Sequence, residues 1–249
     1  MIDHPAENTE LLALWKDVFG DHGGFWELFL ETGFSPDRCR CVMEDGHIAA
    51  ALCWLDFSCR GQKLAYLYAV MTRPDCRGRG LCRALMADTH GLLSQRGYAG
   101  AVLVPAEESL RQMYEKLGYR TCTAVTEFAC AAGAEAADLR CVTPEEYGRL
   151  RRQALPEGGA LQEGASLSFL AAQAELFAGE DFLLAAWGEG DTLHGMELLG
   201  DRAAAPGILK ALGFAKGTFR TPGTDRPFAM FLPLSPDAKA PDYFGFAFD

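Results

Sequence analysis

Cysteine patterns typical of metal sites and of disulfide frameworks are absent from this sequence. The chain has nine cysteines, an odd number, and none of them forms a C-x-x-C pair. Neither a zinc site nor a disulfide scaffold is therefore indicated, and buried, reduced thiols are the default for a cytosolic chain. We predict a protein that binds no metal.

Long apolar runs are missing as well. No stretch reaches the roughly 18 to 20 apolar residues that cross a bilayer. The start of the chain, MIDHPAENTE, also lacks the basic-then-apolar pattern of a signal peptide. The expectation is a cytoplasmic protein without a membrane partner.

Positive charge is in deficit. The chain carries 23 Lys and Arg against 34 Asp and Glu, which gives a formal net charge of -11. Such a surface disfavours nucleic acids and anionic membranes, and it would steer cationic substrates toward the protein. Simple solubility explains the same charge equally well.

Apolar material, in contrast, is plentiful. With 249 residues, of which 49% are hydrophobic, the chain can build one large domain or two small ones. The segment Ala131–Asp138 is small and polar enough for a linker. We predict two domains, residues 1–132 and residues 139–249.

Strand and turn signals dominate the chain up to residue 72. Asp45-Gly46 and Arg60-Gly61 predict hairpin turns that separate strands at 39–43, 47–57 and 63–72. In the third strand, period-two alternation places Tyr66, Tyr68, Val70 and Thr72 on one face. Both faces are largely apolar, as expected for a central strand.

The stretch from Leu64 to Leu85 holds the main functional signal. A strand runs into the loop Arg77-Gly78-Arg79-Gly80, and a helix begins at Leu81. A glycine loop at a helix N-terminus offers unpaired N–H groups and the positive end of the helix dipole, which together bind phosphate. The loop lacks the Gly-Lys-Ser/Thr of triphosphate loops and the third glycine of dinucleotide folds. A plain tight turn with solvated arginines is the alternative.

A faint internal repeat links the two halves. Residues 100–119 align without gaps to residues 195–214, with four identities, and both segments follow the order strand, helix, Leu-Gly-aromatic. Nothing like Arg-Gly-Arg-Gly precedes the second copy. The aromatic C-terminal stretch 241–249 is expected to dock, either as an edge strand or over a groove.

Two motifs together resemble a known family. Residues 70–81, VMTRPDCRGRGL, and residues 113–119, MYEKLGY, resemble the two signature regions of the GNAT superfamily of acyl-CoA-dependent N-acyltransferases. The first resembles the family's pyrophosphate loop, Q/R-x-x-G-x-G/A, although Cys82 stands at its last position. One helix and one strand separate the two motifs, and a hairpin of the kind found in the family precedes them. This spacing makes the pair of motifs a specific signal.

The resemblance covers the chain to about Cys130 and implies an α/β (α+β) fold, a GNAT-type mixed β-sheet flanked by helices. The internal repeat adds the expectation of a second, degenerate GNAT-like lobe at the C-terminal end. The implied reaction is transfer of an acetyl group from acetyl-CoA, the cosubstrate, to a primary amine of a small molecule or peptide. A non-catalytic acyl-CoA sensor or interaction module is the alternative.

The resemblance also assigns residues to roles. It implies that the cofactor is bound by the end of the central strand, by the glycine loop and by the first helical turn: Val70, Met71, Thr72, Arg77, Gly78, Arg79, Gly80, Leu81 and Cys82. Tyr114 matches the tyrosine that protonates the leaving thiolate in many relatives, and a packed core aromatic is the alternative for it.

The general base has no clear candidate. Some relatives use a glutamate near the start of the central strand, but no Asp or Glu lies between Asp56 and Asp75. A water relayed by the backbone and by Tyr66 or Tyr68 is the preferred hypothesis. The carboxylates of Glu27, Glu107 and the C-terminal Asp249 are the reserves.

Overall fold

The computed structural model describes residues 6–20 and 24–248, and it divides the chain into two compact units. The first unit comprises the described residues up to Leu103, together with Glu107–Arg120 and Phe231–Ala240. The second comprises Val104–Ala106, Thr121–Met230 and the chain from Pro241 on. Both are mixed α/β structures, as the sequence predicts.

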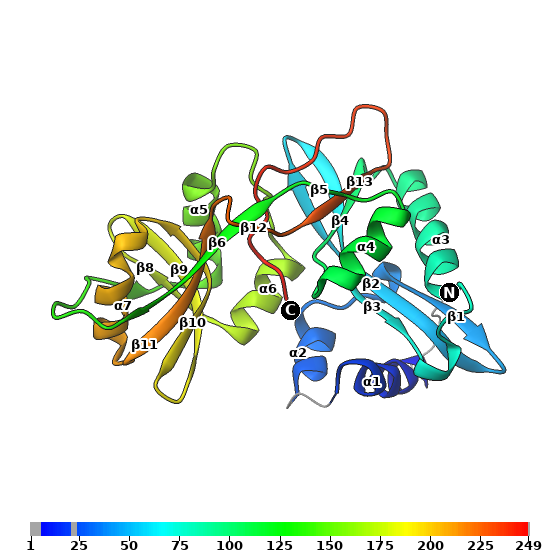
Figure 1. Cartoon of the computed structure of the whole chain (residues 1–249), viewed down its shortest axis with the longest axis horizontal. Coiled ribbons are helices and arrows are strands. Elements are labelled where there is room, and N and C mark those ends of the chain that lie inside the picture. Colours follow the sequence, from blue (N-terminus) through cyan, green and yellow to red (C-terminus); the bar gives the residue numbers. More distant parts are fainter. Residues whose placement is uncertain (1–5, 21–23, 249) are drawn as a thin grey trace. The chain divides into compact units, whose positions relative to one another are not determined.

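The first unit is built on a six-stranded sheet with the order β1-β2-β3-β4-β13-β5 (Figure 1). Its elements are α1 (Ala6–Phe19), α2 (Phe25–Thr32), β1 (Cys39–Glu44), β2 (His47–Cys59), β3 (Gln62–Thr72), α3 (Leu81–Gln95), β4 (Gly100–Leu103), α4 (Glu108–Lys116), β5 (Arg120–Thr121) and β13 (Met230–Pro233). The β1-β2 and β2-β3 pairs are antiparallel, and the β3-β4 pair is parallel. Helices α1 and α3 both pack against β2 and β3.

The two predicted hairpin turns are confirmed. Asp45 and Gly46 have φ angles of 50° and 82°, and Arg60 and Gly61 have 51° and 74°. Positive φ at both central positions gives a backbone twist that matches the twist of the flanking strands. These turns fix the register of β1, β2 and β3.

A β-bulge in β3 overturns the predicted alternation of its side chains. Cys53 of β2 faces Tyr68, but Ala51 faces Met71, so that β3 carries one extra residue there. Ala69, at the bulge, has a φ of 53°. Because the bulge shifts the alternation by one residue, Met71 rather than Val70 shares the face of Tyr68.

The second unit is built on a seven-stranded sheet with the order β12-β6-β11-β10-β9-β8-β7. Its elements are β6 (Ala124–Ala131), β7 (Arg140–Cys141), α5 (Pro144–Ala154), α6 (Ala165–Gln173), β8 (Glu175–Ala178), β9 (Phe182–Glu189), β10 (Thr192–Gly200), α7 (Ala205–Leu212), β11 (Lys216–Pro222) and β12 (Arg226–Pro227). The core under α7 includes Ile208, Leu209, Leu198 and Phe219.

The units divide earlier than the expected boundary at residues 132–139. β6 pairs with β11 of the second unit over all but its first residue, from Ala131 opposite Lys216 to Val125 opposite Pro222. The stretch expected to be a linker is also packed there, since Gly133 N donates to Pro206 O. Conversely, β13, which follows the second unit in sequence, is a strand of the first sheet.

The internal repeat is real, but its register differs from the predicted one. Strands β8, β9 and β10 form antiparallel pairs, and β10 is parallel to β11 beyond α7. This order repeats β1, β2, β3, α3 and β4, so β10 corresponds to β3. The sequence alignment instead matched β10 to β4, because both segments share the local order of strand, helix and Leu-Gly-aromatic.

The C-terminal stretch docks within the second unit, but not as a regular strand. Gln162 holds Phe246 through both backbone groups, because its side chain donates to Phe246 O at 2.8 Å and accepts from Phe246 N at 3.0 Å. One isolated bridge joins Gly159 and Tyr243. The ring centroids of Phe248 and Phe169 lie 4.6 Å apart.

A close approach of β4 to the β13 segment makes one glycine sensitive to substitution. A Cβ on Gly100 would overlap the ring of Phe231 and lie 3.1 Å from Leu232 O. We expect Gly100→Ala to lower the free energy of unfolding by about 1–3 kcal/mol, as overpacking does. Gly91 in α3 has open space around it, and Gly91→Ala should stabilise the protein by up to about 1 kcal/mol. Urea unfolding of both variants checks this, and equal effects would contradict it.

A partly buried histidine gives the first unit a predictable pH dependence. His90 Nε2 lies 2.8 Å from the Tyr119 hydroxyl, and burial lowers the pKa of His90 to about 4. The unfolded chain takes up this proton near pH 6.5, so the contribution of neutral His90 is present above that pH and is lost as the pH falls toward 4. Thermal unfolding between pH 7 and pH 4.5 should therefore show a smaller loss of stability in His90→Gln than in the wild-type protein. Parallel curves for the two proteins would refute this role.

Candidate active site

The predicted phosphate loop connects β3 to α3. A short 3-10 turn, Pro74–Cys76, is followed by Gly78 and Gly80 with φ angles of 76° and 80°. Gly80 is the N-cap of α3 and provides no side-chain cap, so the first amides of the helix remain available to an outside acceptor. No atom lies within 4 Å of a Cβ built on either glycine. The loop is thus an open, exposed cradle of backbone N–H groups.

Each loop arginine has a partner in the structure. Arg73 Nε donates to Asp75 at 2.6 Å, and Arg77 Nε donates to the carbonyl of Thr72 at 3.2 Å. Arg79 forms a bidentate pair with Glu44 at the end of β1, at 2.7 and 2.9 Å. Sequence reasoning missed Glu44, because a contact across 35 positions leaves no local pattern.

The end of β3 next to this loop has an open edge. β3 pairs with β4 only from Leu64 to Tyr66, opposite Gly100–Val102. Among the described residues, Met71 and Thr72 pair only with β2, and Val70 lies in the bulge without a partner in that register. No strand of the described chain covers this segment on the β4 side, where the Thr72 carbonyl accepts a hydrogen bond from Arg77.

Tyr114 lies on α4 with 6% of its surface exposed. Its hydroxyl forms no hydrogen bond with any residue that the structure describes, whereas the hydroxyl of neighbouring Tyr119 is engaged by His90. Burial raises the pKa of Tyr114, and the nearby thiol of Cys82 raises it further. Burial also raises the pKa of Cys82 itself. The structure thus brings Tyr114 near the first turn of α3.

The base candidates are less favourably placed. Glu27 is exposed on α2, and Glu107 precedes α4 and accepts a hydrogen bond from Ser109. Asp249 lies outside the described residues. Tyr66 and Tyr68 are buried on β3, with ring centroids 6.0 Å apart. The water relay through these tyrosines stays a prediction.

The corresponding loop of the second unit has lost the features of a phosphate site. It connects β10 to α7 through Asp201, whose carboxylate accepts a hydrogen bond from Ala203 N at 2.9 Å. Pro206 lies in the first turn of α7 and has no N–H to donate. This loop therefore has an acidic side chain that caps its own backbone and a proline without an N–H, whereas α3 of the first unit begins with uncapped amides.

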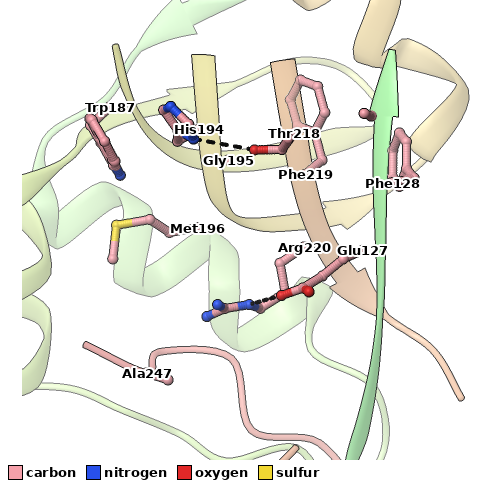
Figure 2. Close-up of a pocket in the computed structure, with 11 residues that line it drawn as sticks. Glu127, Phe128, Trp187, His194, Gly195, Met196, Thr218, Phe219, Arg220 and Ala247 are labelled. Carbon is pink, nitrogen blue, oxygen red and sulfur yellow. Dashed lines mark hydrogen bonds and ion pairs between the residues drawn. The ribbon is translucent and has the colours of Figure 1, made fainter. Parts of the chain in front are cut away.

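A hollow of about 530 Å³ opens on the sheet of the second unit. Trp187 stacks on His194 with ring centroids 4.3 Å apart, and Arg220 donates to Glu127 at 3.0 Å (Figure 2). Met196 and Ala247 also line it, as Figure 2 shows. None of the predicted cofactor or catalytic residues lines this hollow.

The described part of the chain offers neither a metal site nor a membrane-spanning helix. Within residues 6–20 and 24–248, no group of three or more His, Cys, Asp or Glu side chains is arranged to hold a metal ion. No helix of the described part of the chain is long and apolar enough to cross a membrane.

Comparison with known proteins gives one family match. Residues 4–122 match the acetyltransferase (GNAT) domain. No curated protein matches the sequence.

Solved structures share the fold over nearly the whole chain. The GCN5-related N-acetyltransferase from Anabaena variabilis is 17% identical, with a TM-score of 0.73, and the match covers 93% of this chain and 71% of that one. The GCN5-related N-acetyltransferase from Kribbella flavida is 16% identical, with a TM-score of 0.69 and coverages of 91% and 68%.

A third solved structure carries two lobes. A tandem GNAT protein from the clavulanic acid biosynthesis pathway is 13% identical, with a TM-score of 0.58 and coverages of 94% and 97%. The GNAT-type fold with a second, degenerate lobe is thus confirmed. The family match thus covers residues 4–122 with the acetyltransferase (GNAT) domain, and the solved structures show that the GNAT-type fold extends over nearly the whole chain.

Proposed function

We propose that the first unit transfers an acetyl group from acetyl-CoA to the primary amine of a small molecule or a peptide. Acetyl-CoA donors and amine acceptors are general to the family. The observation that carries the proposal for this chain is the open edge of β3, which leads directly into an uncapped helix N-terminus. These two features suit the two parts of coenzyme A, an extended pantetheine arm and a pyrophosphate.

The loop fits a pyrophosphate in both shape and charge. Gly78 and Gly80 leave free space where side chains would otherwise lie. The amides at the start of α3 can donate hydrogen bonds to an anion. Arg77 and Arg79 add positive charge beside them. Cys82 narrows the cradle compared with Gly or Ala but keeps its amide. The backbone of Val70, Met71 and Thr72 is assigned to the pantetheine arm.

The transfer requires that the amine attacks the thioester carbonyl, forming a C–N bond while the C–S bond breaks. The developing oxyanion needs a donor, for which a backbone N–H of the β3 edge is assigned. The amine loses a proton and the leaving sulfur gains one. Tyr114 is assigned as the donor to sulfur because its hydroxyl is uncommitted, whereas that of Tyr119 is engaged by His90.

The raised pKa of Tyr114 has two consequences. Its hydroxyl stays protonated throughout the neutral range, so a proton is always available. A weaker acid is also a poorer donor, since a thiol has a pKa of about 8.5 and a phenol of about 10 in water. The same burial would raise the basicity of a thiolate next to it, and this offsets the mismatch.

The acceptor is assigned only by class. The net charge of -11 favours a cationic amine such as a polyamine, an aminoglycoside-like compound or a lysine side chain.

The rival function is an acyl-CoA sensor, which the lack of a carboxylate between Asp56 and Asp75 favours. Coenzyme A release from acetyl-CoA across a panel of amines separates the two. Binding of acetyl-CoA without amine-stimulated release would favour the sensor.

Replacing Tyr114 tests the proton donor. Tyr114→Phe should lower kcat by about 100-fold, the low end of general-acid effects, because thiolate is already a fair leaving group. The dissociation constant of coenzyme A should change little. Tyr119→Phe serves as the control, since its hydroxyl is committed to His90, and it should retain most of the activity. Equal kcat values for the wild-type protein and Tyr114→Phe from pH 6 to 10 would remove Tyr114 from the mechanism.

Replacing Gly80 tests the phosphate cradle. Gly80→Ala strains a residue with a φ of 80° and places a Cβ at the mouth of the loop. We expect coenzyme A to bind about tenfold more weakly or worse, since hydrogen bonds to charged groups contribute about 1.5–3 kcal/mol each. Gly97→Ala imposes similar strain, at a φ of 76°, beyond the other end of α3. Calorimetric titration should show normal coenzyme A binding for Gly97→Ala, and similar losses in both variants would indicate a folding effect only.

A further inference from the structure

We propose that Glu44 sets the affinity of the coenzyme A loop by competing with the phosphates for Arg79. This inference rests on the proposed function, because it takes the loop to be the phosphate site. Glu44 belongs to neither family motif and lies on the first hairpin, at the end of β1. It changes the affinity through Arg79 and touches no reacting atom.

The contact has the geometry of a strong pair. Arg79 donates from both terminal nitrogens to the two oxygens of Glu44, at 2.7 and 2.9 Å. A carboxylate and a phosphate present matching pairs of oxygens to this planar fork. An incoming phosphate and Glu44 therefore compete for the same face of the guanidinium.

Both partners can exchange at little cost. The Arg79 side chain is 55% exposed and stands between two glycines, while that of Glu44 is 23% exposed. Once released, Glu44 can turn toward water, because it adjoins the exposed turn at Asp45-Gly46. Ion pairs with an exposed partner contribute little to stability, and a doubly charged ligand can offset the loss of this one when it takes the place of Glu44.

Glu44 distinguishes Arg79 from the other arginine in the loop motif. Arg77 donates to a neutral backbone carbonyl and keeps its full positive charge toward the cradle. The charge of Arg79 is neutralised by Glu44 until a ligand arrives. The pair therefore weakens binding of every ligand that carries the phosphates, including the product coenzyme A, and it speeds product release.

Calorimetric titration with coenzyme A at low ionic strength tests this in four proteins: wild type, Glu44→Gln, Arg79→Gln and the double variant. Glu44→Gln should bind coenzyme A roughly two- to fivefold more tightly, the range that corresponds to loss of a competing surface ion pair. In the Arg79→Gln background, the Glu44→Gln change should have no effect. Thermal unfolding of each variant checks that the fold is intact.

A neighbouring residue provides the matched control. Asp45 carries the same charge one position further along and makes no contact with Arg79 among the described residues. Its φ of 50° is tolerated by Asn. Asp45→Asn should leave coenzyme A affinity unchanged, and tightening equal to that of Glu44→Gln would show a general charge effect and overturn the proposal.

The remaining outcomes separate this proposal from the proposed function. Failure of the wild-type protein to bind coenzyme A would overturn both. Normal wild-type binding with unchanged or weaker binding in Glu44→Gln would overturn the role of Glu44 alone. An equal gain from Glu44→Gln with and without Arg79 would also overturn it, because the competition runs through that arginine.

Discussion

The bulge in β3 is the constraint on which the site depends. One extra residue between the partners of Ala51 and Cys53, with Ala69 in the left-handed region, bends the strand where its pairing with β4 has already ended. A non-glycine residue in this region is strained and persists only when the surrounding structure holds it. Here the antiparallel pairing with β2 holds both sides of the bulge. The strain thus produces an unpaired backbone edge that leads directly to the helix N-terminus beyond it.

The second unit repeats the bulge and uses it differently. The pairing of β10 with β9 shifts between Gly195 and Glu197, and Glu197 is fully buried after the shift. Its carboxylate accepts hydrogen bonds from Arg151 at 2.6 and 2.9 Å and from the hydroxyl of Tyr243 at 2.9 Å. A Cβ on Gly245 would overlap this carboxylate. Removing either charge would leave the other buried without an opposite charge, which is strongly destabilising. The same backbone irregularity therefore adjoins an open strand edge in one unit and the attachment of the C-terminal segment in the other.

Local signals predicted the parts of the site that local chemistry determines. Asp45-Gly46, Arg60-Gly61 and the glycines at 78 and 80 need positive φ, and the sequence shows this directly. The bulge was missed because alanine at position 69 carries no such signal. Other features depend on contacts between distant segments. They are the pair of Glu44 with Arg79, the pair of His90 with Tyr119, and the places of β6 and β13 in the sheets. The repeat register failed for a related reason: β4-α4 and β10-α7 share a local pattern, whereas only strand pairing reveals that β10 corresponds to β3.

The position of β13 has a consequence for synthesis of the chain. The first sheet has β13 between β4 and β5, although β13 begins at Met230, far beyond the glycine loop and α4. A nascent chain that has just completed β5 therefore exposes one unpaired edge of β4, and such edges pair readily with other chains. The sheet that carries the site closes only after nearly all of the second unit has been made. Completion of the protein, rather than of the family domain, is the step that protects this edge.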